Sequence, residues 1–132
     1  MTLTRRHFLA LVPLVLVARP AAAMRTRKPK HPTPRPGITA AKVLPDARLT
    51  DKSAALVYAM VREIPQVVDG IRCNCGCADL AGFYSLLTCY EQGGMAQHCV
   101  ICQGQAKLAH KLHGEGWSLN GIRTAIDAQF GD

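Results

Sequence analysis

The stretch CNCGCADLAGFYSLLTCYEQGGMAQHCVIC, residues 73–102, contains all six cysteines of this 132-residue chain. Its first part, Cys73-Asn74-Cys75-Gly76-Cys77, cannot present three thiols on one face of a helix, because residue i+2 points away from residues i and i+4. We therefore expect a loop at this position. In such a loop Gly76 would let the backbone fold around a small centre.

The crowding of the cysteines predicts a metal centre. Thiolates and imidazoles are the ligands that hold Zn²⁺, Cu(I) and iron in proteins. Cys99 and Cys102 are three residues apart, on one face at the start of an expected helix, where the helix dipole favours a thiolate. His98 is the one histidine whose position in the sequence suits a ligand. The expected ligands are Cys73, Cys75, Cys77, Cys89, Cys99 and Cys102, with His98 in reserve.

Six thiolates are more than one ion requires, so a pair of Zn²⁺ or Cu(I) ions with bridging thiolates fits the count better. An iron–sulfur cluster held by four of the six is also possible. We find no Ser/His/Asp arrangement, phosphate loop or paired carboxylate motif that argues for hydrolysis. The leading interpretation is therefore a non-catalytic metal-binding protein with a structural, storage or trafficking role.

Two alternatives use the same cysteines without a metal. An even number of cysteines in an exported chain is ordinarily a disulfide framework, but bridges within the Cys73–Cys77 run would close strained rings. Cys99 and Cys102 form a Cys-x-x-Cys pair, which is typical of thiol–disulfide exchange when it lies in a βαβ unit. No such unit is visible, but thiol–disulfide redox chemistry, or electron transfer through an iron–sulfur cluster, remains the competing hypothesis.

Residues 43–132 are expected to form an all-α domain of about four short helices with a cysteine-rich metal-binding loop. Apolar spacing and caps place helices at residues 51–64, 79–92 and 99–113, and a last helix from Ser118 to Phe130. On the second helix, Cys89 would lie opposite an apolar arc that includes Leu80. On the third helix, Ile101 would lie on the apolar stripe. His110 would lie about 12 Å along the helix axis from Cys102, too far to share one ion with it.

Residues 1–23 predict a signal peptide. Arg5 and Arg6 precede an apolar run of ten residues, Phe8–Val17, and Ala21-Ala22-Ala23 forms a cleavage pattern. This run is shorter than the roughly 20 residues that a spanning helix needs. The arginine pair resembles a twin-arginine signal, which implies export of a folded protein to the periplasm by the export machinery.

The net charge of +7 is concentrated near the N-terminus. Residues 24–42 carry six basic residues and four prolines, which predict a disordered basic tail acting as a spacer, with weak contact to the envelope surface as an alternative. The remainder, residues 43–132, has seven basic and nine acidic residues. We therefore expect no nucleic-acid partner.

The run at residues 72–77, together with Ser85–Tyr90, His98–Cys102 and Gly121–Asp127, resembles the PCYCGC-motif family of exported, cysteine-rich bacterial proteins. The resemblance covers residues 72–132 and implies an extracytoplasmic location and a metal–thiolate centre. Its members are often lipidated, but no lipobox cysteine is visible here, so no lipid anchor is expected. Arg72 stands in place of the motif's proline, Asn74 in place of its tyrosine, and Phe83 where many members have a histidine.

Overall fold

The computed structural model describes residues 30–131, and the regular structure in this range is entirely helical. The expected all-α fold is therefore confirmed. The α-helices are α1 (Ala55–Glu63), α2 (Pro65–Asp69), α3 (Val100–Gly114) and α4 (Leu119–Phe130). Short 3₁₀ helices connect them: η1 (Ala40–Lys42), η2 (Asp46–Arg48), η3 (Lys52–Ala54), η4 (Cys77–Asp79), η5 (Leu86–Tyr90) and η6 (Ala96–His98).

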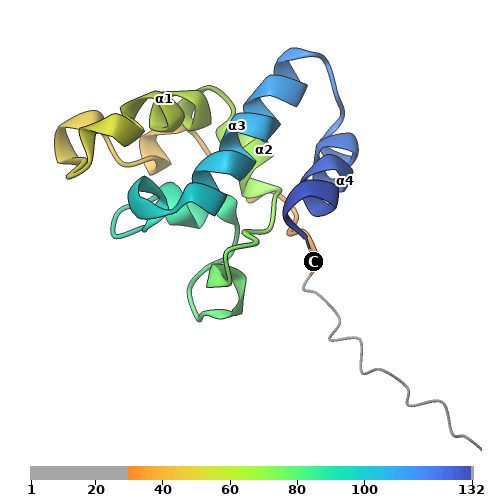
Figure 1. Ribbon diagram of the computed structural model, residues 1–132, viewed down its shortest axis with the longest axis horizontal. Coiled ribbons are helices and arrows are strands. Elements are labelled where there is room, and N and C mark those ends of the chain that lie inside the picture. The colour runs from red at the N-terminus through yellow and green to blue at the C-terminus, as the bar shows by residue number, and fades with distance from the viewer. Residues whose placement is uncertain (1–29, 132) are drawn as a thin grey trace, which may run out of the picture.

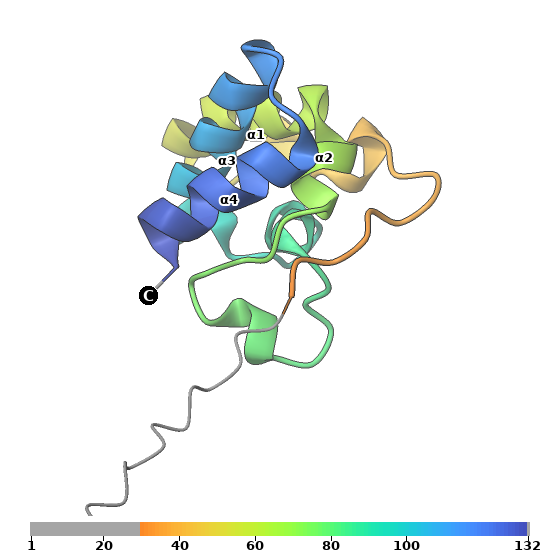
Figure 2. The ribbon, with the colours of Figure 1, turned by 90° about the vertical axis from the view of Figure 1, so that its right-hand side faces the viewer.

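Helix α3 lies at the centre of the molecule, packed between α1 and α4 (Figure 1). Figure 2 views the molecule from the side of α4 and shows a green loop, which follows α2, projecting from the helical body. The loop and the first turn of α3 lie at the same end of the molecule. This end carries the cysteines.

Two of the expected helices form where the sequence predicts them. Asp51 caps the turn η3 by accepting a hydrogen bond from the backbone of Ser53, and α1 follows directly. Ser118 caps α4 through a bond from the Gly121 N–H to its side-chain oxygen, at 3.1 Å. Hydroxyl and carboxylate oxygens satisfy the free N–H groups of a first helical turn, which is why these residues set the helix starts.

Helix α3 also agrees with its prediction, but its buried face is rotated from the expected one. Cys99 is its N-cap, and Ala106, Ala109 and Leu112 are buried. Ile101 was expected on the apolar stripe but is 38% exposed. Because the alanines are small, the neighbouring helices can approach this face closely and exclude water from it.

The predicted helix over residues 79–92 is wrong. After η4 the chain passes through turns, and a separate 3₁₀ helix, η5, begins at Leu86. Ser85 and Thr88 form a capping box, in which each side chain accepts a hydrogen bond from the other's backbone N–H. Leu80, expected on the buried arc, is 53% exposed. Local side-chain bonds and the burial of η5 therefore outweighed the helical spacing of apolar residues.

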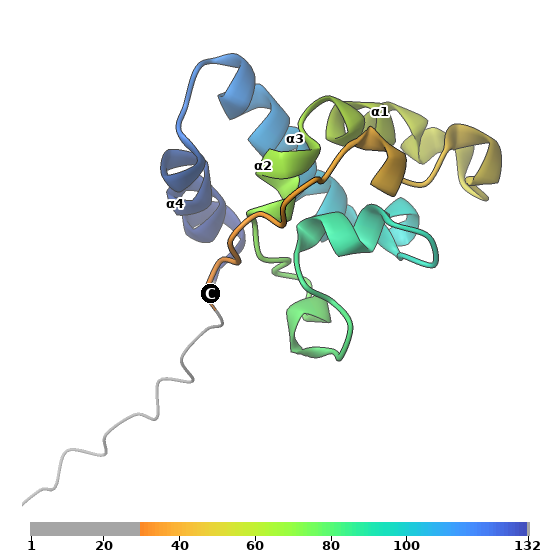
Figure 3. The ribbon, with the colours of Figure 1, turned by 180° about the vertical axis from the view of Figure 1, so that it is seen from behind.

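The prediction of a disordered tail over residues 24–42 is wrong for residues 30–42. Ile38 is buried in the core, and Arg35 binds the buried carboxylate of Asp69. The His31 ring lies 3.0 Å both from Asp127 and from the backbone nitrogen of Arg72. Figure 3 shows this segment, in orange, crossing the surface beside α2. The prolines favour an extended chain, but side-chain contacts hold that chain against the helices.

The predicted signal peptide, residues 1–23, and the start of the tail, residues 24–29, lie outside the described residues. Among residues 30–131, no helix is long and apolar enough to cross a membrane.

Candidate metal centre

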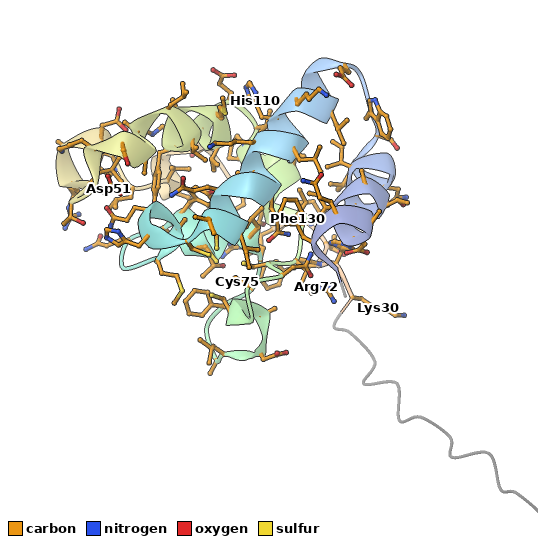
Figure 4. The ribbon with its side chains drawn as sticks, viewed as in Figure 1. Lys30, Asp51, Arg72, Cys75, His110 and Phe130 are labelled. Atoms are coloured by element: carbon orange, nitrogen blue, oxygen red, sulfur yellow. The ribbon has the colours of Figure 1, made fainter. Side chains whose placement is uncertain are left out.

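Three segments bring the six cysteines together. Cys73, Cys75 and Cys77 lie in the loop after α2, Cys89 lies in η5, and Cys99 and Cys102 lie at the start of α3. All six are free cysteines. Figure 4 shows Cys75 below the first turn of α3, with Arg72 between it and Lys30 in this view. The loop, η5 and α3 thus converge on one sulfur-rich centre.

The sulfur atoms form a contiguous cluster. The Cys73 sulfur lies 3.1 Å from that of Cys75 and 3.4 Å from that of Cys102. The Cys75 and Cys77 sulfurs are 2.7 Å apart. These contacts join the loop to α3. The Cys89 sulfur of η5 lies within 4.8 Å of the sulfurs of Cys73 and Cys77, so all three segments meet at the cluster.

Two groups of three thiols within this cluster are close enough to hold a metal ion. One group consists of Cys73, Cys75 and Cys102, and the other of Cys73, Cys77 and Cys89. In each group the sulfurs lie within 4.8 Å of one another. Cys73 belongs to both groups, so its sulfur is positioned to bridge two ions.

The sulfur spacing fits single ions ligated by thiolates. Around a tetrahedral ion with metal–sulfur bonds of about 2.3 Å, neighbouring sulfurs lie about 3.8 Å apart. The contacts of Cys73 with Cys75 and Cys102, at 3.1 and 3.4 Å, are shorter than this value by about 0.7 and 0.4 Å. A small outward movement of each thiol would therefore suffice for an ion to bind.

Hydrogen bonds between the thiols favour a thiolate at the shared position. The thiols of Cys102 and then Cys89 donate to the Cys73 sulfur and hold its pKa well below the usual range of a thiol. The pKa of Cys102 is raised, chiefly because its proton is held in the bond to Cys73. Burial raises the pKa of Cys75. An arriving cation would find the negative charge at Cys73 and would displace protons from its neighbours.

Gln105 of α3 positions the loop and was missed by the sequence analysis. Its side chain is fully buried, accepts from the backbone N–H of Asn74 at 2.9 Å and donates to the carbonyl of Arg72 at 3.0 Å. It thereby holds the residues on both sides of Cys73. The position of Gln105, one turn after Cys102 on the same face of the helix, was the available sequence signal.

Two of the three departures from the PCYCGC motif, Arg72 and Asn74, bind each other. The Arg72 guanidinium donates to the Asn74 side-chain oxygen at 2.6 and 3.1 Å, so the pair bridges the backbone of Cys73. Arg72 also lies 3.5 Å from Asp127 of α4. Gly76 has a φ of 96°, which a glycine adopts without strain, and this turn brings Cys77 back toward Cys75.

Neither Cys99 nor His98 belongs to either group of three thiols. The Cys99 sulfur caps α3 by accepting from the Cys102 N–H at 3.3 Å, and it belongs to neither group of three. The His98 side chain is 62% exposed and faces Thr50 and Asp51, at 3.3 and 4.0 Å. The structure therefore does not bring His98 to the thiols. His110 lies toward the opposite end of α3 from Cys75, as its spacing predicted (Figure 4).

Met95 lies at the cluster and was also missed. Its thioether sulfur is 3.2 Å from the Cys77 sulfur, although Met95 belongs to a different loop. Gly94 lets the chain before Met95 pack closely against the backbone of Cys89, because a Cβ there would overlap the Cys89 carbonyl. A methionine beside a Gly-Gly turn carries no sequence pattern that marks it as a ligand, so only the folded chain places it here.

The fold and the site define a class: a small helical protein with a buried cluster of free thiols that could hold a metal ion. The particular family follows from the sequence. Residues 37–132 match the family described as a protein of unknown function with PCYCGC motif, and the chain belongs to that family. No curated protein and no solved structure matches the chain.

Proposed function

We propose that this protein holds two thiophilic metal ions, Zn²⁺ or Cu(I), in one thiolate cluster bridged by Cys73. The main support is that two groups of three thiols share this residue. Each group offers three soft ligands, and a bridging thiolate allows two ions to use five cysteines. A role in holding metal, whether structural, in storage or in trafficking, suits a centre in which the thiols of Cys73, Cys77, Cys89 and Cys102 are buried.

The spacing of the thiols favours single ions over an iron–sulfur cluster. Such a cluster places iron and inorganic sulfide between its cysteine ligands, which must therefore stand well apart. Here the three sulfurs of each group lie within 4.8 Å of one another. We therefore propose ions held directly between thiolates.

The metal content of the purified chain tests this proposal. We expect about two ions per full-length chain, bound without inorganic sulfide, because two groups of three thiols are present. Metal analysis and thiol titration after anaerobic purification would measure both quantities. A sample alkylated before loading is the control and should bind none.

Two outcomes would contradict the proposal. Three disulfides with no bound metal would support the disulfide framework instead. Iron and sulfide in comparable amounts, with visible absorbance, would support the electron-transfer alternative.

We also propose that the protein is exported to the periplasm as a folded, metal-loaded domain. The support is the sequence of residues 1–23, with its arginine pair, short apolar run and alanine cleavage pattern. Folding before export would protect the thiols, because the cytoplasm is reducing.

Export by this route predicts a strong effect of the arginine pair. Changing Arg5 and Arg6 to lysine keeps the charge, and we expect the protein to remain in the cytoplasm of a bacterial host that has a twin-arginine pathway. Changing Arg25 and Arg27 to lysine is the matched control and should leave export intact. Cell fractionation measures the result, and normal export of the Arg5/Arg6 variant would exclude this route.

A further inference from the structure

Within residues 30–131, Met95 supplies the one sulfur of the cluster that is not a thiol. Its sulfur contacts Cys77, which belongs to the group of Cys73, Cys77 and Cys89. These three cysteines are at most 4% exposed, whereas Met95 is 42% exposed. The thioether thus lies between this buried group and the solvent.

The ligand set of this group is three thiols and one thioether. A thioether is neutral and soft, and it selects Cu(I), whereas Zn²⁺ is also well served by harder nitrogen and oxygen ligands. Neither His98 nor any other nitrogen or oxygen ligand belongs to this three-thiol group among the described residues. The ligands available at this position are therefore all sulfur atoms.

We propose that Met95 is the fourth ligand of the ion at Cys73, Cys77 and Cys89, and that it makes this position selective for Cu(I) over Zn²⁺. The inference rests on the proposed function, since it assumes that the thiols hold metal. The other group, with Cys75 and Cys102, has no methionine in contact with it in the described part of the chain and takes either ion.

The exposure of Met95 adds a second role. An ion that approaches Cys77 from the solvent meets the Met95 sulfur, and the two sulfurs are close enough for an ion to pass from one to the other. Weak neutral ligands exchange faster than thiolates, which carry a charge. Met95 therefore also sets the rate at which Cu(I) is transferred to and from this position.

The test compares Met95→Leu with the unchanged full-length chain. Leucine keeps the apolar volume and removes the sulfur. Met60→Leu, on α1, is the matched control for loss of a methionine. Anaerobic samples are loaded with Cu(I) or Zn²⁺ alone, and a chromophoric chelator competes for each ion, so that affinity and transfer rate are both measured.

We expect Met95→Leu to weaken Cu(I) binding at one of the two positions by about tenfold or more, and to slow transfer to the chelator. Zinc affinity should change by less than about twofold, and Met60→Leu should match the unchanged chain. X-ray absorption of the copper-loaded protein should show fewer sulfur neighbours per copper in Met95→Leu.

Other results would overturn the inference. Unchanged Cu(I) affinity would show that Met95 only packs against Cys77. An equal fall for both ions would show a structural role without selectivity. If the unchanged chain bound neither metal, the proposed function itself would fail. If that chain bound zinc and not Cu(I), the proposed function would stand and only the role of Met95 would be excluded.

Discussion

Replacing Cys73 with serine is expected to reduce the metal content from about two ions per chain to less than one. Cys73 is the member common to both groups of three thiols, so its loss leaves only two thiols in each. Two thiolates without the central negative charge hold an ion weakly, and Cys73 is the thiol whose pKa is lowered by hydrogen bonds from Cys102 and Cys89. Metal analysis after gel filtration measures the effect.

Matched serine variants separate this result from misfolding. Cys89→Ser also buries a hydroxyl and should retain one ion, because Cys73, Cys75 and Cys102 remain. Cys75→Ser should likewise retain one ion, held by Cys73, Cys77 and Cys89. Cys99→Ser should retain two, since Cys99 caps α3 and belongs to neither group. Equal losses in all four variants would contradict a bridging role for Cys73.

Replacing Asp69 with alanine is expected to lower the free energy of unfolding by about 3 kcal/mol. Asp69 is fully buried at the end of α2 and accepts bonds from the Arg35 backbone, the Arg35 guanidinium and the Ser85 hydroxyl. The carboxylate thus ties the N-terminal segment to α2 and to the start of η5. Denaturant unfolding of the metal-free protein measures the loss. Asp46→Ala removes an exposed ion pair with Arg62 and should cost less than about 1 kcal/mol.

The same carboxylate gives the stability a defined pH dependence. Burial raises the pKa of Asp69, but bonds from Arg35 and Ser85 outweigh it and hold the pKa below its usual range. The contribution is therefore complete above the unfolded value of about 3.9 and is lost as the pH falls through the folded pKa. In acid the difference between Asp69→Ala and the unchanged chain should shrink. A difference that stayed constant from pH 7 into strong acid would exclude this carboxylate as the cause.

The candidate site was predictable in composition but not in geometry. Spacing arguments identify all six cysteines as one centre, because local crowding is a property of the sequence. They do not show that Cys73 is shared, that Cys99 is a cap, or that His98 faces Thr50 and Asp51. Those facts depend on how η5 and α3 pack against the loop. Met95 and Gln105 were missed for the same reason.

Part of the fold was likewise predictable from the sequence, and part was not. Where a cap and a steady apolar face coincide, as from Ser118 to Phe130, local preferences determine the helix. Over residues 79–92 a regular spacing was present, but the capping box at Ser85 and the burial of Leu87 and Tyr90 produced a short 3₁₀ helix. A helical spacing of apolar residues does not by itself show which faces pack against another element.

Patterns along the chain are enough to predict the helical class, the limits of three helices and the crowding of the thiols. These depend on caps, periodicity and the crowding of one residue type, all of which act between near neighbours in the chain. Tertiary structure alone decided that residues 30–42 join the domain, since Arg35 meets Asp69 only after folding. It also decided the shared position of Cys73 and the approach of Met95 to Cys77. These contacts join separate segments, and their geometry is set by packing around α3.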